Sequence, residues 1–216
     1  MNTIIERYNK IKSNILSLNP KKQINIVAVS KTFPLDHIKP LIDYRHNHFG
    51  ENKVQEASHK WKEIKKIKKD LKLHMVGKLQ SNKAKNAVEI FDYIHSLDSQ
   101  KLADVLSKSQ KNLNKSLKYF IQVNIGNEPQ KSGIPSNELE GFYDYCMKEK
   151  KLEISGLMII PPNDQNPEKY FKLTNELNKR FELKELSMGM SSDYHEAVKF
   201  NSTFVRVGSL IFGERS

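Results

Sequence analysis

Short apolar runs and longer amphipathic runs alternate along the whole chain. A short apolar run that ends at polar or glycine-containing sequence predicts a buried strand, whereas apolar residues spaced three or four apart predict a helix. The predicted strands cover residues 24–31, 46–51, 71–77, 93–98, 117–125, 154–160, 184–189 and 204–208. The predicted helices cover residues 1–20, 35–42, 54–64, 83–90, 99–111, 135–150, 166–177 and 193–200.

This alternation favours an α/β fold built on a parallel sheet. Parallel strands joined by helices form right-handed βαβ units. Eight such units close into a (β/α)₈ TIM barrel, although a doubly wound open sheet gives a similar alternation. No linker or low-complexity tract interrupts the chain. We therefore expect one barrel domain over residues 1–216, in which residues 1–20 form a leading amphipathic helix.

The charge of the chain is positive, at +11 from 36 Lys and Arg against 25 Asp and Glu, and the mean hydropathy is −0.64. A basic protein invites a nucleic-acid hypothesis. The lysines, however, recur in nearly every predicted helix, and basic residues do not interleave with aromatic ones as in sites that stack bases. We interpret the charge as a solvated exterior and expect no specific nucleic-acid partner.

The compartment expected from the sequence is the cytoplasm. The amino terminus carries charge within its first turns and lacks the apolar segment of a secretory signal. No apolar run approaches the roughly 20 residues of a membrane span, so no membrane partner is expected. Cys146 is the only cysteine, which excludes an intrachain disulfide and fits a reducing compartment. We expect its thiol to serve packing.

Lys31 is the residue that first suggests chemistry. It ends the first predicted strand, so its amine would lie at the carboxyl mouth of a buried sheet, where ligands bind. Removal from water lowers the pKa of an amine, and a neutral amine attacks aldehydes to form a Schiff base. The alternative is a solvated lysine whose stem runs past the strand end.

Other candidates follow the remaining strands. Two loops that contain glycine and serine come after the seventh and eighth strands, where barrels commonly bind phosphate through backbone N–H groups. Arg206 ends the last strand, as a fixed cation or as a surface residue of an edge strand. A reactive lysine, a phosphate-binding loop and a fixed cation together are the arrangement expected for pyridoxal 5′-phosphate.

Longer motifs extend this set through most of the chain. They are Val27-Ala28-Val29-Ser30-Lys31, His48-Phe49-Gly50-Glu51-Asn52, His74-Met75-Val76-Gly77-Lys78-Leu79-Gln80, Gln122-Val123-Asn124-Ile125 with Gln130-Lys131-Ser132-Gly133, Gly156-Leu157-Met158, Ser187-Met188-Gly189-Met190-Ser191-Ser192-Asp193 and Val205-Arg206-Val207-Gly208-Ser209. In this order they resemble the pyridoxal phosphate homeostasis protein family, whose fold is similar to the amino-terminal barrel of alanine racemase. Lys53, Lys78 and His195 depart from the usual pattern of that family.

The resemblance implies a site and a function. Lys31 would carry pyridoxal phosphate as an internal aldimine, and Arg206 would face the ring nitrogen and keep it unprotonated. Ser187, Ser191, Gly208 and Ser209 would hold the phosphate, whereas Asn52 and Met158 would line the ring. The implied function is vitamin B6 homeostasis: the chain holds and delivers the cofactor without turnover, as a monomer, with apo forms of pyridoxal enzymes as candidate partners.

An enzyme remains the alternative. Arginine at the ring nitrogen weakens the electron sink that carbanion chemistry needs. The sequence ends at Ser216, soon after the last predicted strand, so we expect no second domain of the alanine racemase kind. A small amino-acid racemase would need a second base opposite Lys31, for which Tyr194 and His195 are the candidates. His46 and His48 share one strand face, but two histidines alone do not predict a metal site.

Overall fold

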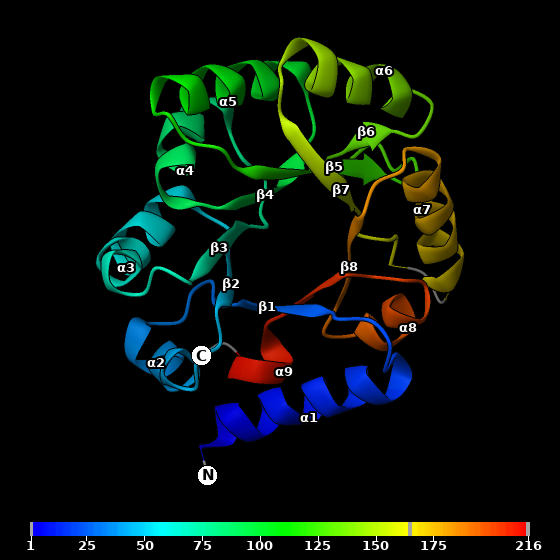
Figure 1. Cartoon of the computed structure of the whole chain (residues 1–216). Helices are drawn as coiled ribbons and strands as arrows, with labels where there is room; N and C mark the ends of the chain where they lie inside the picture. The colour runs from blue at the N-terminus through cyan, green and yellow to red at the C-terminus, as the bar shows by residue number, and fades with distance from the viewer. Residues whose placement is uncertain (1, 164–165, 215–216) are drawn as a thin grey trace.

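The computed structural model describes residues 2–163 and 166–214, and so the ends of the predicted 1–216 domain lie outside the described residues. Its central element is a ring of parallel strands surrounded by helices (Figure 1). The barrel strands are β1 (Asn25–Val29), β2 (His48–Glu51), β3 (Lys72–Met75), β4 (Tyr93–Leu97), β5 (Lys118–Asn124), β7 (Glu153–Met158), β8 (Glu185–Met190) and β9 (Phe204–Val207).

The pairing of the strands confirms the predicted barrel. The strands follow the order β4-β3-β2-β1-β9-β8-β7-β5, and a further pairing between β4 and β5 closes the ring. Every pairing is parallel, so the carboxyl ends of the strands all open on one face. An open doubly wound sheet would leave β4 and β5 as unpaired edges, and their pairing excludes that alternative.

Helices surround the strands and bury the outer face of the barrel. They are α2 (Leu35–Asp43), α3 (Val54–Ile67), α4 (Ala84–Ile90), α5 (Gln100–Asn112), α6 (Leu139–Asp144), α7 (Glu168–Arg180), α8 (Tyr194–Lys199) and α9 (Ser209–Phe212), with a 3₁₀ turn η1 (Ser81–Lys83). The leading helix α1 (Thr3–Leu18) lies beside α2, α8 and α9 (Figure 1). Its buried face includes Ile4, Ile11 and Ile15, as the periodicity predicts, but Leu18 at its end is 39% exposed.

Two hydrophobic cores result from the alternation of side chains along each strand. Along β1, Ile26 and Ala28 pack outward against the helices, whereas Val27 and Val29 point to the interior. The interior cluster also contains Phe120, Met158 and Phe204. Because both faces of the strands are buried, they read as continuous apolar runs in the sequence.

One predicted helix is wrong at its start. The pattern predicts a helix over 135–150, but Ile134 and Pro135 form a short strand β6 beside the end of β5. Helix α6 begins at Leu139 and continues as a π-helical turn η2 (Tyr145–Glu149). Proline suits the first turn of a helix, but its fixed φ angle and missing N–H also suit a short edge strand, and here the pairing with β5 prevails.

The close approach of β7 and β8 gives a test of the barrel. A Cβ at Gly156 would overlap the backbone carbonyl of Glu185, its partner in β8, whereas a Cβ at Gly141 on α6 would meet nothing. We expect Gly156→Ala to lower the free energy of unfolding by about 2–3 kcal/mol, because backbone cannot yield as a side chain can. Gly141→Ala should raise it by about 0.5–1 kcal/mol. Urea titrations measure both, and equal stability of the two variants would contradict the close packing.

Candidate functional site

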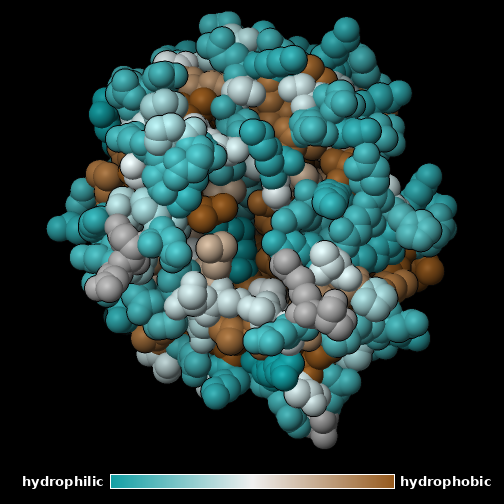
Figure 2. Space-filling model, turned by 180° about the vertical axis from the view of Figure 1, so that it is seen from behind, coloured by the Kyte–Doolittle hydropathy of each residue, from teal (hydrophilic) through white to brown (hydrophobic). Residues whose placement is uncertain are grey.

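A cavity of about 900 Å³ opens at the carboxyl ends of the strands. Figure 2 shows a hollow near the centre of one face of the molecule, with apolar side chains in its wall. The apolar part of the lining includes Val29, Val76 and Ile160. Six of the eight predicted site residues line the cavity, namely Lys31, Asn52, Ser191, Arg206, Gly208 and Ser209. The fold therefore brings together residues that are up to 178 positions apart.

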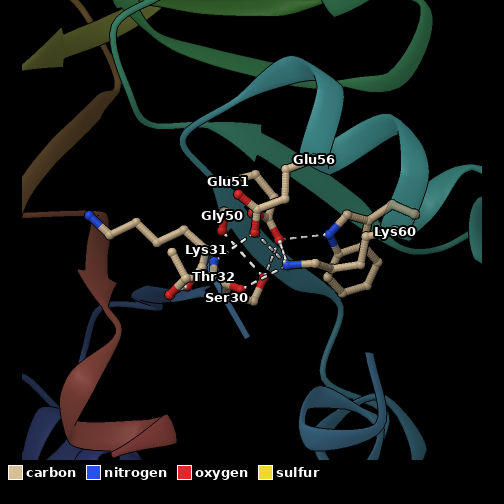
Figure 3. Close-up of polar contacts among 8 residues, drawn as sticks. Ser30, Lys31, Thr32, Gly50, Glu51, Glu56 and Lys60 are labelled. Atoms are coloured by element: carbon tan, nitrogen blue, oxygen red, sulfur yellow. Dashed lines mark hydrogen bonds and ion pairs between the residues drawn. The ribbon is translucent and has the colours of Figure 1, made fainter. Parts of the chain in front are cut away.

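Lys31 lies two residues after the end of β1 and is half-buried. The backbone N–H of Ser30 donates to the carbonyl of Gly50 at 2.9 Å, which continues the pairing of β1 with β2 up to the lysine. Thr32 then takes a positive φ of 69°, and the chain turns away from the barrel. Figure 3 shows the Lys31 side chain leading away from Glu51 and Lys60. Lys31 thus comes directly after Ser30, whose backbone is still bonded to the neighbouring strand.

A buried ionic network behind β1 holds this turn (Figure 3). The ammonium of Lys60 donates to Glu51 at 2.9 Å, to Glu56 at 3.0 Å and to the carbonyl of Ser30 at 2.9 Å. The same Glu51 oxygen accepts from the Ser30 hydroxyl at 2.8 Å and from the indole of Trp61 at 2.9 Å. These contacts come from β1, β2 and α3, so the network ties the strand that precedes Lys31 to its neighbour.

Glu56 also holds the turn, on the side that follows Lys31. The backbone N–H of Thr32 donates to Glu56 at 2.6 Å, which fixes the residue that follows Lys31.

Glu51 is fully buried, and burial raises its pKa, although its hydrogen bonds from Trp61 and Lys60 oppose the shift. Among the described residues its second oxygen has no hydrogen-bond partner. Such a carboxylate depends on the one cation beside it.

Arg206 lies inside the barrel mouth and not on an edge strand. It is 5% exposed, and its Nη1 donates to the Ser187 hydroxyl at 2.7 Å while Nη2 donates to the carbonyl of Ile159 at 2.8 Å. Burial lowers its pKa to about 10, which leaves it charged at neutral pH. The surface alternative is thereby excluded, and the cavity has a fixed cation in its floor.

Two predicted residues do not line the cavity. Ser187 is fully buried and contacts Arg206 on one side and His95 on the other. Met158 is fully buried in the interior core. Both lie within their strands, and Ile160 and Ser191, a few residues further along, line the cavity in their place.

The loops after β8 and β9 supply donors at one side of the cavity. Gly189 has a φ of 94°, which only glycine adopts readily, and Ser191 and Ser192 come directly after this strand. Gly208 is the residue before α9, and the first N–H groups of a helix have no partners within the helix. This side of the cavity therefore combines hydroxyl and backbone donors, which suit an anion.

The loop after β5 adds a second polar side to the cavity, and none of its residues is among the eight predicted site residues. Gln122, Asn124, Gln130 and Ser132 line the cavity from this loop and strand. Lys131, also in the lining, pairs with Glu128 at 2.6 Å. Their motif is present in the sequence, and the end of the strand over 117–125 was the signal that could have placed them, because all strand ends converge on this face.

Outside the cavity, His46 lies just before β2 and makes two hydrogen-bonding contacts. His46 Nε2 lies 2.7 Å from the carbonyl of His48, and its Nδ1 lies 3.1 Å from the hydroxyl of Tyr8. Within residues 2–163 and 166–214, no group of three or more His, Cys, Asp or Glu is arranged to hold a metal ion. In the same residues we find no helix with the length and apolar character of a bilayer span.

Comparison with known proteins fixes the family. The profile described as "Alanine racemase, N-terminal domain" matches residues 7–216. A pyridoxal phosphate homeostasis protein of Aquifex aeolicus is 37% identical over 199 residues, which cover 88% of this chain and 86% of the relative. One of Pasteurella multocida is 35% identical, over 99% of this chain and 98% of the relative. The chain belongs to the pyridoxal phosphate homeostasis protein family.

Solved structures agree with this assignment. PipY of Synechococcus elongatus with PLP bound is 37% identical and has a TM-score of 0.87, over 97% of this chain and 100% of PipY. Alanine racemase of Clostridium difficile has a TM-score of 0.72 at 12% identity, over 99% of this chain and 57% of the racemase. The second similarity shows the fold alone, whereas PipY, at 37% identity, is a similar protein whose structure holds PLP.

The ionic network behind Lys31 gives a test of how this family member is built. Lys60→Met leaves Glu51 buried without its cation, and we expect the free energy of unfolding to fall by about 3 kcal/mol. Lys66→Met is the matched control, since Lys66 pairs with Glu63 at 61% and 74% side-chain exposure, and it should change stability little. Chemical denaturation measures both variants. Equal stability of the Lys60 and Lys66 variants would contradict the role given to the network.

Proposed function

We propose that this chain holds pyridoxal 5′-phosphate covalently on Lys31, in the service of vitamin B6 homeostasis and without catalytic turnover. The observation that carries the proposal is that Lys31, Arg206 and the donor-rich loop at Gly208 line one cavity. The names of the relatives and the PLP bound to PipY support it. The cofactor supplies an aldehyde, which condenses with a lysine amine and releases water.

The cavity fits such a ligand. Its apolar wall of Val29, Val76 and Ile160 suits an aromatic ring, and Ser191, Gly208 and Ser209 offer donors for a phosphate. Asn52, directly after β2, lines the same cavity, and in this proposal it contacts the ring. Ser187 and Met158 do not line the cavity. In this proposal Ser187 accepts a hydrogen bond from Arg206 and so holds it, and Met158 packs in the interior core of the barrel.

Arg206 supports binding over catalysis. Its guanidinium only donates hydrogen bonds, so a ring nitrogen beside it is an acceptor and stays unprotonated. An unprotonated ring is a weak electron sink, which disfavours the removal of a proton from a bound amino acid. The Ser187 and Ile159 contacts hold the guanidinium in this position.

The two bases that the sequence suggested for a racemase, Tyr194 and His195, lie outside the cavity lining. Tyr194 is 5% exposed, and its hydroxyl accepts from Asn14 of α1 at 3.2 Å. His195 lies 3.2 Å from Glu196 with its side chain 46% exposed. Neither residue lines the cavity. This leaves Lys31 without either proposed partner for a two-base mechanism.

The wider role is part of the same proposal. A cavity open to solvent allows exchange of its ligand with other proteins, and apo forms of pyridoxal enzymes are the proposed recipients. Cys146 is a buried, unpaired thiol, which supports a reducing compartment such as the cytoplasm. We propose that the chain acts there as a monomer.

The attachment point is tested with two lysines of the same cavity. The chain incubated with pyridoxal phosphate should turn yellow and give an adduct that borohydride traps. Lys31→Ala should abolish the trapped adduct, whereas Lys78→Ala, which changes another lining lysine, should retain it. Absorption spectra before and after reduction measure both. A chain that stays colourless, or an adduct that survives in Lys31→Ala, would overturn the proposal.

The absence of turnover is tested separately. Alanine or serine is mixed with the loaded protein in deuterated water, and the α-proton signal is followed by NMR. We expect no exchange beyond that of free pyridoxal phosphate at the same concentration. Exchange at enzyme-like rates that disappears in Lys31→Ala would favour the racemase.

A further inference from the structure

A continuous series of hydrogen bonds runs through the barrel from Arg206. Arg206 Nη1 lies 2.7 Å from the Ser187 hydroxyl, which lies 2.7 Å from Nδ1 of His95. His95 Nε2 lies 2.9 Å from Nδ1 of His74, and His74 Nε2 lies 2.9 Å from Nδ1 of His48. We call Ser187, His95, His74 and His48 the histidine relay. The proposed function uses Ser187 alone of these four.

The relay joins the two ends of the barrel. Arg206 lines the cavity at the carboxyl ends of the strands, whereas His48 is the first residue of β2 and is partly exposed at the amino end. His74 and His95, between them, are fully buried. Their rings are held by stacking, His74 on Tyr93 at 4.3 Å and His95 on Phe120 at 4.3 Å between ring centroids. The imidazoles therefore cannot turn away from one another without repacking the interior.

The chemistry of arginine gives the relay a direction. A guanidinium has no acceptor, so the Ser187 oxygen must accept from Arg206. Among the described residues, the only other partner of that hydroxyl is His95, so the Ser187 proton points to His95 Nδ1. A neutral imidazole that accepts at Nδ1 carries its proton on Nε2, and this Nε2–H donates to His74. The same step repeats from His74 to His48.

The opposite direction has a definite cost. If His95 donated from Nδ1, the Ser187 oxygen would receive two donors, and its own proton would have no acceptor among the described residues. Buried hydroxyl protons without an acceptor are unfavourable. Both inner rings are also neutral: burial lowers the pKa of His74 and of His95 well below the ordinary value, and Arg206 lowers that of His95 further.

We propose that Arg206 locks Ser187, His95, His74 and His48 into a single hydrogen-bond direction, so that the guanidinium at the cavity sets the tautomer of a histidine at the opposite end of the barrel. Ser187 and the histidines are positioning residues in this arrangement. They hold the oxygen that receives Arg206, and each ring is held in the Nε2–H form by the ring before it.

The same geometry argues against a proton path. A proton that moves along such a relay reverses every hydrogen bond in it, and the reversed relay would direct His95 Nδ1–H at the oxygen that Arg206 already occupies. As long as Arg206 is charged, the relay keeps one direction. It therefore transmits an orientation and not a charge.

The lock is tested by nitrogen NMR of the full chain labelled with ¹⁵N-histidine, at neutral pH and without ligand. In the unchanged chain we expect His48, His74 and His95 as single Nε2–H tautomers. Ser187→Ala removes the hydroxyl, and Arg206→Met removes the donor that orients it. Either change should cause loss of the single tautomer at His95 and, through it, at His48. Ser187→Thr keeps the hydroxyl and should retain the pattern.

Three results would overturn the proposal: Nδ1–H tautomers in the unchanged chain, tautomers that stay the same in both Ser187→Ala and Arg206→Met, or a Ser187→Thr variant that behaves as Ser187→Ala. If Arg206→Met does not fold, Ser187→Ala decides alone. Because no ligand is present in the measurement, its result is independent of the test of the proposed function.

Discussion

Closure of the barrel through the pairing of β4 with β5 is the constraint on which the rest of the structure depends. Eight parallel strands that close into a ring must open all their carboxyl ends on one face. Lys31, after the first of them, and Arg206, on the last, come from adjacent strands, because β1 and β9 pair directly. Closure also creates an interior in which polar side chains can meet without water.

Among the described residues, the ionic network and the histidine relay are buried polar networks that each hold one part of the cavity. On the outer side of the barrel wall, Glu51 and Lys60 hold Ser30, before Lys31, and Glu56 holds Thr32, after it. Inside them, the histidine relay supports the oxygen that receives Arg206. Such groups add little to stability when compared with apolar packing, but they fix geometry.

The sequence predicted the strands well because both of their faces are buried, so each appears as an apolar run of strand length. The sequence predicted less well how far along the barrel axis each side chain lies. Met158 and Ser187 belong to the correct strands but lie below the cavity, since a pattern of period two tells the face of a side chain and not its height in the barrel. The pattern also assigned Pro135 to the wrong type of element, because proline is compatible with both a helix start and an edge strand.

The ionic network and the relay were beyond the reach of sequence patterns. Glu51 meets Lys60 and Trp61 only because α3 folds back over β2, and the histidines are 21 and 26 positions apart along the chain. No periodicity connects them. Their contacts depend on the register between strands, which follows from closure of the ring.

In the proposed function, Lys31 is the lysine that the fold presents for covalent attachment. The most direct measurement is peptide mass spectrometry of the chain after incubation with pyridoxal phosphate, reduction with borohydride and proteolysis. We expect one added pyridoxyl group, on the peptide that contains Lys31. Modification spread over Lys78, Lys131 and the surface lysines, with no preference for Lys31, would contradict it.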